Sequence, residues 1–369
     1  MFFFTDGLAS LDLIGERPSG ERFRVGLGRA FEPSFRFYSL RVDDSAASAF
    51  YVVARPRHEG NIIRVNGARA YSGIPVSVPL PSGDSTISVE AERLSGRIAK
   101  YSIDVRRMDL ASEYFVEELR PGLWRIQDYG GFPSYEDMYL IEGPERALLV
   151  DTGMGRGDLA TEVAKLTDKP LSIALTHGHY DHRGQLDCFP DSPIYMSEAD
   201  KPLLPPGSEL RRFHWVRGGD RIDLGGGDHV ETIAVPGHTA GSLAFLHPRT
   251  RSLAVGDAVG SGSYVFLFLP GSPPLSLYRD ALEALRRRVS DEGDLRFLVG
   301  HHWQERVPLA GPAALDLVSD MCALADEVIA GRRVGKRSSI RIGPTGEIEC
   351  RVAELGLAAL WYNPDNLGD

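Results

Sequence analysis

Three histidines and one aspartate lie within six residues of the segment Thr176–His182, which reads T-H-G-H-Y-D-H. Imidazole and carboxylate groups are the ligands that zinc and similar divalent cations take in proteins. Two histidines at positions i and i+2 can converge on one ion, which leaves Asp181 and His182 directed to another position. Only 10 histidines occur in 369 residues, so a chance cluster of this density is not expected. The spacing suggests a two-metal site.

Further residues of the same kinds follow other apolar, strand-like segments at their carboxyl ends. They are Asp151, His238, Asp257 and His301. Because α/β folds place functional side chains beyond the carboxyl ends of their strands, we expect these residues to meet the histidine-rich segment at one edge of a sheet. Any one of them alone would indicate little, whereas the ordered series indicates a single site.

Strand-like and helical segments alternate from Leu123 onward, which predicts an α/β domain over residues 121–369. Leu171–Leu175 is a short apolar segment that ends at the histidine-rich loop. Apolar residues recur at helical spacing in Leu275–Val289 and in Ala313–Ala330, so these segments are predicted helices. The elements that position the site are therefore short strands with helices between them.

Residues 34–107 show no helical period and consist of short strand-like runs separated by turn signals such as Asn66-Gly67. This pattern predicts a small all-β sandwich. The motifs of this segment resemble the cadherin-like β-sandwich module. The shared features are I-x-V-N-G at Ile63–Gly67, a run at Pro79–Val89 and a closing Y-x-I-x-V-x-R at Tyr101–Arg107.

Two flanking segments have no clear pattern of their own. Residues 1–33 contain several phenylalanines, and we interpret them as an N-terminal arm or as part of a homodimer contact. Residues 108–120 contain several glutamates and are interpreted as a linker between the β-sandwich and the α/β domain.

From about residue 120 to the end, the chain resembles the metallo-β-lactamase superfamily of hydrolases. The motifs that carry the resemblance are H-x-H-x-D-H at His177–His182, P-G-H-T at Pro236–Thr239, G-D at Gly256-Asp257 and G-H at Gly300-His301. The first motif is highly specific, and the ordered set is more so. The resemblance implies an αββα fold, in which two sheets pack face to face with helices outside.

The same resemblance implies seven ligands for two divalent metal ions. His177, His179 and His238 would hold the first ion, Asp181, His182 and His301 the second, and Asp257 would bridge them. Zinc is the expected metal, with manganese or iron as alternatives. Asp151 would not be a ligand but would orient the metal loop through hydrogen bonds. His302 is the alternative to His301 if the pattern is shifted by one residue.

Two ions roughly 3.5–4 Å apart can share a bridging hydroxide. Metal binding lowers the pKa of that water from about 15.7 toward 7. The hydroxide attacks a carbonyl or phosphoryl centre, and the ions polarise the substrate oxygen. Asp181 could also take or relay a proton, which makes it the candidate catalytic residue.

Two residues exclude branches of the superfamily to which the chain could belong. His179 stands where the oxygen-reducing flavodiiron branch has Glu, and Asp257 stands where a major group of β-lactamases has Cys. These residues favour hydrolysis of a carboxylic ester, lactone or thioester, and aromatic segments suggest a hydrophobic or aromatic substrate. The expected substrate contacts are Tyr135, Tyr264, His302 and Trp303.

Three alternatives to this hydrolase stay open. Two are catalytic, a phosphodiesterase and a β-lactam hydrolase. The third is a non-enzymatic β-sandwich scaffold with a degenerate metallo-domain. The complete set of ligands argues against degeneracy, because a decayed site would be expected to have lost one of them.

The composition restricts the partners. A net charge of −10 and a pI near 5.5 argue against a duplex nucleic-acid binder. No stretch approaches the roughly 18 to 20 apolar residues of a membrane span, and the start M-F-F-F-T-D-G lacks the basic region of a secretory signal. Three cysteines imply no disulfide framework. We expect a cytoplasmic protein that acts on a small-molecule substrate, without nucleic-acid or membrane partners.

Overall fold

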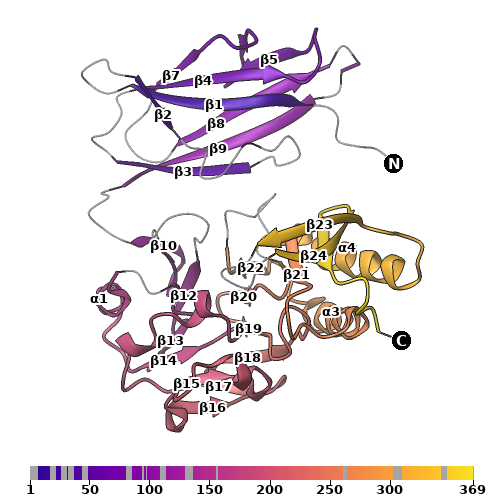
Figure 1. Ribbon diagram of the computed structural model, residues 1–369. Helices are drawn as coiled ribbons and strands as arrows, with labels where there is room; N and C mark the ends of the chain where they lie inside the picture. The colour runs from indigo at the N-terminus through magenta and orange to yellow at the C-terminus, as the bar shows by residue number, and fades with distance from the viewer. Residues whose placement is uncertain are drawn as a thin grey trace. The chain divides into compact units, whose positions relative to one another are not determined.

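The computed structural model describes residues 7–16, 22–25, 31, 37–43, 49–79, 85–93, 95–96, 98–108, 114–128, 136–154, 157–260, 264–301, 310–341 and 347–368. The chain divides into two compact units, Met1–Ser112 and Glu113–Asp369. Both units are drawn as ribbons in Figure 1.

The first unit is a β-sandwich. One sheet has the strand order β2-β1-β4-β7 and the other has the order β3-β9-β8-β5-β6. The strands are β1 (Leu8–Glu16), β2 (Arg22–Val25), β3 (Phe37–Asp43), β4 (Ala49–Pro56), β5 (Ile62–Val65), β6 (Ala68–Ala70), β7 (Val76–Pro79), β8 (Ser85–Glu92) and β9 (Ile98–Met108). Leu11, Phe50 and Ile103 belong to one buried core that takes side chains from both sheets. This is the small all-β sandwich that the sequence predicts.

The structure differs from the expected N-terminal arm at Leu8–Glu16. This segment is β1, which pairs with β4 along its length, and Leu8 N–H donates a hydrogen bond to the Tyr101 hydroxyl at 3.0 Å. The register shifts between Leu8 and Ser10, and such a bulge interrupts the strict alternation by which a strand is found in a sequence. Of the phenylalanines in the proposed arm, Phe23 lies in β2 and Phe31 packs against the sandwich core, whereas Phe2 to Phe4 lie outside the described residues.

The second unit is built on two central sheets. The seven-stranded sheet runs in chain order through β10 (Tyr114–Arg120), β11 (Leu123–Asp128), β12 (Asp137–Glu142), β13 (Ala147–Val150), β14 (Leu171–Ala174), β15 (Ile194–Met196) and β16 (Phe213–Trp215). The five-stranded sheet contains β17 (Arg221–Gly225), β18 (Asp228–Ala234), β19 (Leu243–His247), β20 (Ser252–Gly256) and β22 (Arg296–Val299). Leu148 and Val150 of the first sheet share a buried core with Phe245 and Leu298 of the second, so the sheets pack face to face.

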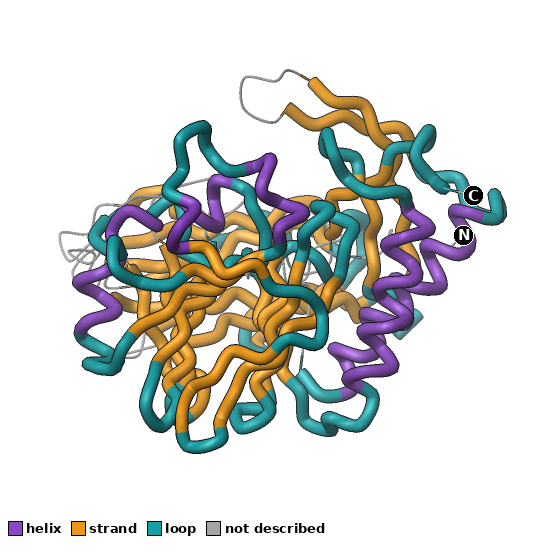
Figure 2. The backbone as a smooth tube through the Cα atoms, turned by 90° about the horizontal axis from the view of Figure 1, so that it is seen from below, coloured by secondary structure: helices purple, strands orange, loops and turns teal. Residues whose placement is uncertain are grey.

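Helices cover the outer faces of these sheets, as Figure 2 shows. Leu159 and Val163 of α1 (Leu159–Ala164) pack in one core with Leu149 of the seven-stranded sheet. The helices α3 (Leu275–Val289) and α4 (Pro312–Ile329) pack in another core with Phe297 of the five-stranded sheet. The layers therefore follow the αββα order that the resemblance implies, and the helices predicted at 275–289 and 313–330 are present.

A third sheet and four short helical segments complete the described part of this unit. The sheet has the order β21-β25-β24-β23, with β21 (Tyr264–Leu267), β23 (Lys336–Arg341), β24 (Glu347–Leu355) and β25 (Ala358–Tyr362). The short segments are α2 (Tyr180–Arg183), η1 (Leu186–Cys188), η2 (Glu198–Leu203) and η3 (Leu210–Arg212). Among the described helices, none is both long enough and apolar enough to cross a membrane.

The structure also differs from the linker expected at 108–120. Tyr114–Arg120 is β10, which pairs antiparallel with β11 at the edge of the seven-stranded sheet. Tyr114 is buried, whereas Glu117 forms an ion pair with Arg125 at 2.6 Å. Charged side chains on an edge strand are common. Here they interrupt the alternation of apolar residues by which a strand is predicted.

Candidate metal centre

The predicted ligands lie beyond the carboxyl ends of strands from both central sheets. His177, His179, Asp181 and His182 lie between β14 and the end of α2, His238 follows β18, Asp257 follows β20, and His301 follows β22. β14 runs parallel to β13, and β22 runs parallel to β20. Parallel neighbours bring their carboxyl ends to the same edge, so the topology gathers these distant residues.

The first group is His177, His179 and His238. His179 Nδ1 lies 3.0 Å from His177 Nε2 and 2.9 Å from His238 Nε2, and the three rings are nearly perpendicular to one another. Three ring nitrogens that face one point cannot all be satisfied by hydrogen bonds among themselves, because neutral imidazole has a single N–H. One divalent cation would satisfy all three lone pairs.

The second group is Asp181, His182 and His301. His301 Nε2 lies 3.7 Å from Asp181 Oδ2, and His182 Nε2 lies 4.0 Å from the same oxygen. The three residues offer ligand atoms that all lie within 4.8 Å of one another. Two imidazoles and one carboxylate are again a ligand set of the zinc type.

Asp257 lies between the two groups and directs one oxygen to each. Its Oδ1 is 3.5 Å from His182 Nε2 and 3.6 Å from His301 Nε2, whereas its Oδ2 is 3.7 Å from His238 Nε2. The carboxylate would thus be able to hold an ion on each side. Asp257 Oδ1 and His182 Nε2 are buried without a hydrogen-bond partner, and leaving each so costs about 1–3 kcal/mol. A metal ion fits both orphaned atoms.

Asp151 supports the metal loop from behind. Its Oδ2 accepts hydrogen bonds from the Thr176 hydroxyl and from His182 Nδ1, both at 2.8 Å, and its Oδ1 accepts from Thr176 N–H at 2.8 Å. Because the Thr176 hydroxyl donates to Asp151, its oxygen accepts from His177 Nδ1 at 3.1 Å. Both histidines, when neutral, therefore carry their proton on Nδ1 and offer Nε2 to a metal.

A backbone carbonyl fixes the position of the ring proton of His238 in the same way. His238 Nδ1 donates to the Phe266 carbonyl at 2.9 Å. A carbonyl oxygen only accepts, so the proton is on Nδ1 and the lone pair is on Nε2. Phe266 was not predicted to hold a ligand, and no sequence signal could have indicated this contact, because the main chain makes it.

Comparisons with known proteins agree with this geometry. Residues 131–301 match the model of the Metallo-beta-lactamase superfamily, and residues 14–108 match that of the Cadherin-like beta sandwich domain. The probable metallo-hydrolase YqgX of Bacillus subtilis (strain 168) is 30% identical over 158 residues, which cover 38% of this chain and 72% of that protein. The chain belongs to the metallo-β-lactamase superfamily.

Two further similarities extend the comparison. A hydroxyacylglutathione hydrolase of Thermosynechococcus vestitus is 32% identical over 157 residues, 41% of this chain. The matched region spans only 58% of that protein's length. A metallo-beta-lactamase family protein of Thermus thermophilus has a crystal structure that matches with a TM-score of 0.45 at 21% identity, over 58% of this chain and 82% of that chain.

Two rings of the first group, those of His177 and His179, have lowered pKa values. Burial, together with the neighbouring histidines, lowers the pKa of His177 well below its usual value. Burial and the charge of His238 lower the pKa of His179 to about 3. At neutral pH these rings therefore present lone pairs rather than protons, which is the state that a cation requires.

The second group is different, because carboxylates surround it. Burial opposes charge on His182, but Asp151, Asp181 and Asp257 together raise its pKa to about 10. Burial also opposes charge on His301, but Asp257 raises its pKa to about 9. Without a metal, protons on these two rings supply the positive charge that the carboxylates require.

Glu136 is a further acid near the second group that no sequence motif indicated. It precedes β12 and is 1% exposed. Burial raises the pKa of Glu136 to about 7, and the charge of Asp181 adds to this effect, although His301 and His182 oppose it. A buried carboxyl group that titrates near neutral pH can hold or release a proton beside the second group.

The predicted substrate contacts fall mostly outside the described residues. Tyr135, His302 and Trp303 are not among them. Tyr264 is half-buried at the start of β21, the strand whose Phe266 carbonyl holds His238. Its assignment as a substrate contact stays a prediction.

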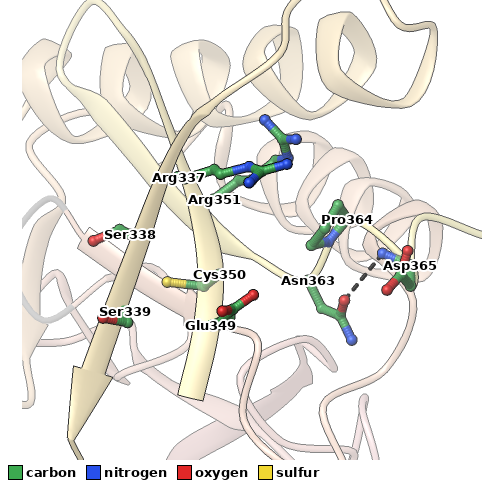
Figure 3. A pocket seen from close by; sticks show the side chains of 9 residues that line it. All are labelled: Arg337, Ser338, Ser339, Glu349, Cys350, Arg351, Asn363, Pro364 and Asp365. Carbon is green, nitrogen blue, oxygen red and sulfur yellow. Dashed lines mark hydrogen bonds between the residues drawn. The ribbon is translucent and has the colours of Figure 1, made fainter. Parts of the chain in front are cut away.

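A surface pocket of about 500 Å³ lies elsewhere in the second unit, between β23, β24 and the turn after β25. Arg337 and Arg351 oppose each other in the strand register, and Figure 3 shows their guanidinium groups directed to the same side of the hairpin. Arg351 Nη1 donates to the Gly335 carbonyl at 2.8 Å. None of the seven predicted ligands lines this pocket, so it is separate from the metal centre.

Metal binding should release protons from the second group. Imidazole ligands must be neutral, so below pH 9 the binding of an ion displaces the protons that His182 and His301 hold, and the metal affinity falls as the pH is lowered. Calorimetry at pH 7 in buffers of different ionisation enthalpy should show release of about two protons per chain. Asp151→Asn, which removes the carboxylate beside His182 Nδ1, should reduce that number. Metal uptake without proton release would contradict this assignment.

Replacement of His301 should remove one metal ion, whereas replacement of His302 should not. His301 Nε2 lies 3.6 Å from Asp257 Oδ1, so His301→Ala should lower the metal content from about two ions to about one. His302→Ala is the neighbouring control and should leave the content unchanged. Elemental analysis of both purified variants measures this metal content. Loss of an ion in His302→Ala but not in His301→Ala would assign the ligand to His302.

Proposed function

We propose that this chain is a dinuclear metal-dependent hydrolase that cleaves a carboxylic ester, lactone or thioester. The observation that supports it most directly is the placement of Asp257, whose two oxygens face two separate groups of ligands. His177, His179 and His238 would hold one ion, Asp181, His182 and His301 the other, and Asp257 both. When bound, such ions supply a water activated at neutral pH and polarise the substrate's carbonyl oxygen.

The chain's own residues would perform the proton transfers. Asp181 is one of the two ligands that are not fully buried, with its side chain 31% exposed, so it could both bind an ion and exchange a proton with a leaving group. Asp151 keeps the His182 ring in one orientation by accepting from Nδ1. The Phe266 carbonyl does so for His238. Because the rings are already held in place, the site would need little rearrangement during the reaction, and such preorganisation increases the rate.

Two observations support an acyl substrate with an apolar part. The similarity to a hydroxyacylglutathione hydrolase favours the thioester within this class. Phe266, Phe268 and Trp361 form an aromatic cluster, with ring centroids 5.6 to 6.4 Å apart. Because Phe266 also holds His238, this cluster is joined to the metal centre through one residue, and it supports a hydrophobic or aromatic substrate.

Loss of the bridge should abolish both metal binding and hydrolysis. Purified protein should contain about two divalent ions per chain, and Asp257→Ala should lower activity by more than the roughly 10–100-fold that loss of an outer hydrogen-bond partner costs. His214→Ala is a matched control, because His214 is exposed, stacks on Tyr195 at 5.1 Å and is not one of the predicted ligands. A metal-free wild-type protein, or a fully active Asp257→Ala variant, would refute the proposed function.

A substrate panel should separate the reaction classes. Initial rates on chromogenic thioesters, lactones, β-lactams and phosphodiesters should be highest for the acyl substrates without a strained lactam, and higher for aromatic than for short aliphatic acyl groups. Each rate should vanish in the Asp257→Ala variant, which controls for a contaminating esterase. If phosphodiesters or β-lactams were the better substrates, the acyl assignment would be wrong while the metal centre stood.

A further inference from the structure

The side chain of Asp200 is buried between the two loops that carry the first histidine group. Asp200 lies in η2 and is 1% exposed. Asp200 belongs to none of the ligand motifs, and no role is predicted for it from the sequence. A carboxylate that is buried so completely must be compensated by hydrogen bonds or charges, so its partners indicate its purpose.

The Asp200 carboxylate accepts hydrogen bonds from both loops. Its Oδ2 accepts from Gly178 N–H at 2.8 Å and from the Thr239 hydroxyl at 2.7 Å. Its Oδ1 accepts from Gly241 N–H at 2.6 Å. Gly178 lies between the ligands His177 and His179, and Thr239 directly follows the ligand His238. One side chain therefore connects the backbone segments of all three histidines.

The direction of each hydrogen bond around Thr239 is determined. An ionised carboxylate only accepts, so the Thr239 hydroxyl donates to Asp200. The Thr239 and Ser242 hydroxyl oxygens are 2.8 Å apart, so Ser242 must be the donor between them. The Ser242 oxygen in turn accepts from Thr239 N–H at 3.1 Å. No other placement of the hydroxyl protons keeps all of these hydrogen bonds, so the network is rigid.

The two loops approach Asp200 closely because glycine occupies the contact positions. A Cβ atom on Gly241 would lie 2.6 Å from Asp200 Cγ, and one on Gly178 would lie 2.9 Å from Leu203 Cβ. Any side chain at either position would displace the loop from the carboxylate. Loop spacing is thus set by direct contact as well as by hydrogen bonds.

We propose that Asp200 is a positioning residue that fixes the separation of the two loops and so holds His177, His179 and His238 ready for the first metal ion. This proposal rests on the proposed dinuclear centre. Asp200 acts through Gly178, Thr239 and Gly241 rather than by touching the ion or the substrate.

Substitution by the isosteric asparagine cannot preserve the network. If the amide oxygen replaces Oδ2, its NH₂ group meets Gly241 N–H. If the oxygen replaces Oδ1, the NH₂ group meets Gly178 N–H. Two donors then face each other in either orientation, so the hydrogen bond from Gly241 or the one from Gly178 is lost whichever way the amide turns.

Asp200→Asn should weaken the first metal site and spare the second. Titration of the metal-free protein with Zn²⁺ against a competing chelator should show a loss of about 10–100-fold in the affinity of one of two ions. The visible spectrum of the Co²⁺ form should change, because it reports the ligand geometry. Asp320→Asn is the matched control. Among the described residues, Asp320 accepts one hydrogen bond, from Leu357 N–H at 2.7 Å, and an asparagine can keep it.

Thr239 provides a milder pair of variants. Thr239→Val removes the hydroxyl donor and should also weaken the first site, whereas Thr239→Ser retains the donor and should restore wild-type affinity and spectrum. If wild-type protein binds two ions and both Asp200→Asn and Thr239→Val bind them with unchanged affinity and spectrum, the role of Asp200 is refuted. If the wild-type protein binds no metal, the proposed function fails with it.

Discussion

The metal centre depends on the convergence of buried ligand atoms that hydrogen bonds within the protein do not satisfy completely. His177 Nε2 and His238 Nε2 both lie within 3.0 Å of His179 Nδ1, and Asp257 Oδ1 and His182 Nε2 are buried without hydrogen bonds. Such an arrangement is unfavourable unless a cation completes it. The surrounding network therefore has to hold the ligands together against their mutual repulsion, and it does so with acceptors placed behind the rings. Asp151 takes the Nδ1 proton of His182, and the Phe266 carbonyl takes that of His238.

The fold supplies these acceptors from elements that are far apart in the chain. Asp151 directly follows β13 and has a positive φ of 63°, a conformation that Asp tolerates better than most residues. That conformation turns its carboxylate toward Thr176 at the end of the neighbouring parallel strand. Phe266 belongs to β21, which pairs with β25 in the third sheet. The third sheet is therefore connected to the metal centre through the main chain of β21, in addition to packing against α4.

The αββα order and the seven expected ligands follow from the resemblance to the metallo-β-lactamase superfamily, which short local motifs carry. The residue pattern alone indicated a two-metal site and an α/β domain. The supporting contacts could not be predicted. Asp200 meets Gly178 and Thr239 across 22 and 39 positions of the chain, and no pattern of residue types encodes that encounter. The Phe266 contact involves a carbonyl that every residue possesses. The strands at Leu8–Glu16 and Tyr114–Arg120 were missed for a different reason, because a bulge in the first and charged residues in the second hide the alternation of buried positions.

The two histidine groups also differ in how they carry charge, and the difference follows from the position of the carboxylates. Asp151 and Asp181 lie beside the second group, and Asp257 is shared between both. The His182 and His301 rings are consequently protonated without a metal, with pKa values of about 10 and 9, while burial keeps His177 and His179 neutral. His177 and His179 can accept a cation without giving up protons, but they have little carboxylate charge beside them to offset that cation. The second group offers carboxylate charge, but only after its protons leave. Asp257 couples the two groups. An ion bound by the first group would offset part of the negative charge of Asp257, and that charge helps to keep His182 and His301 protonated.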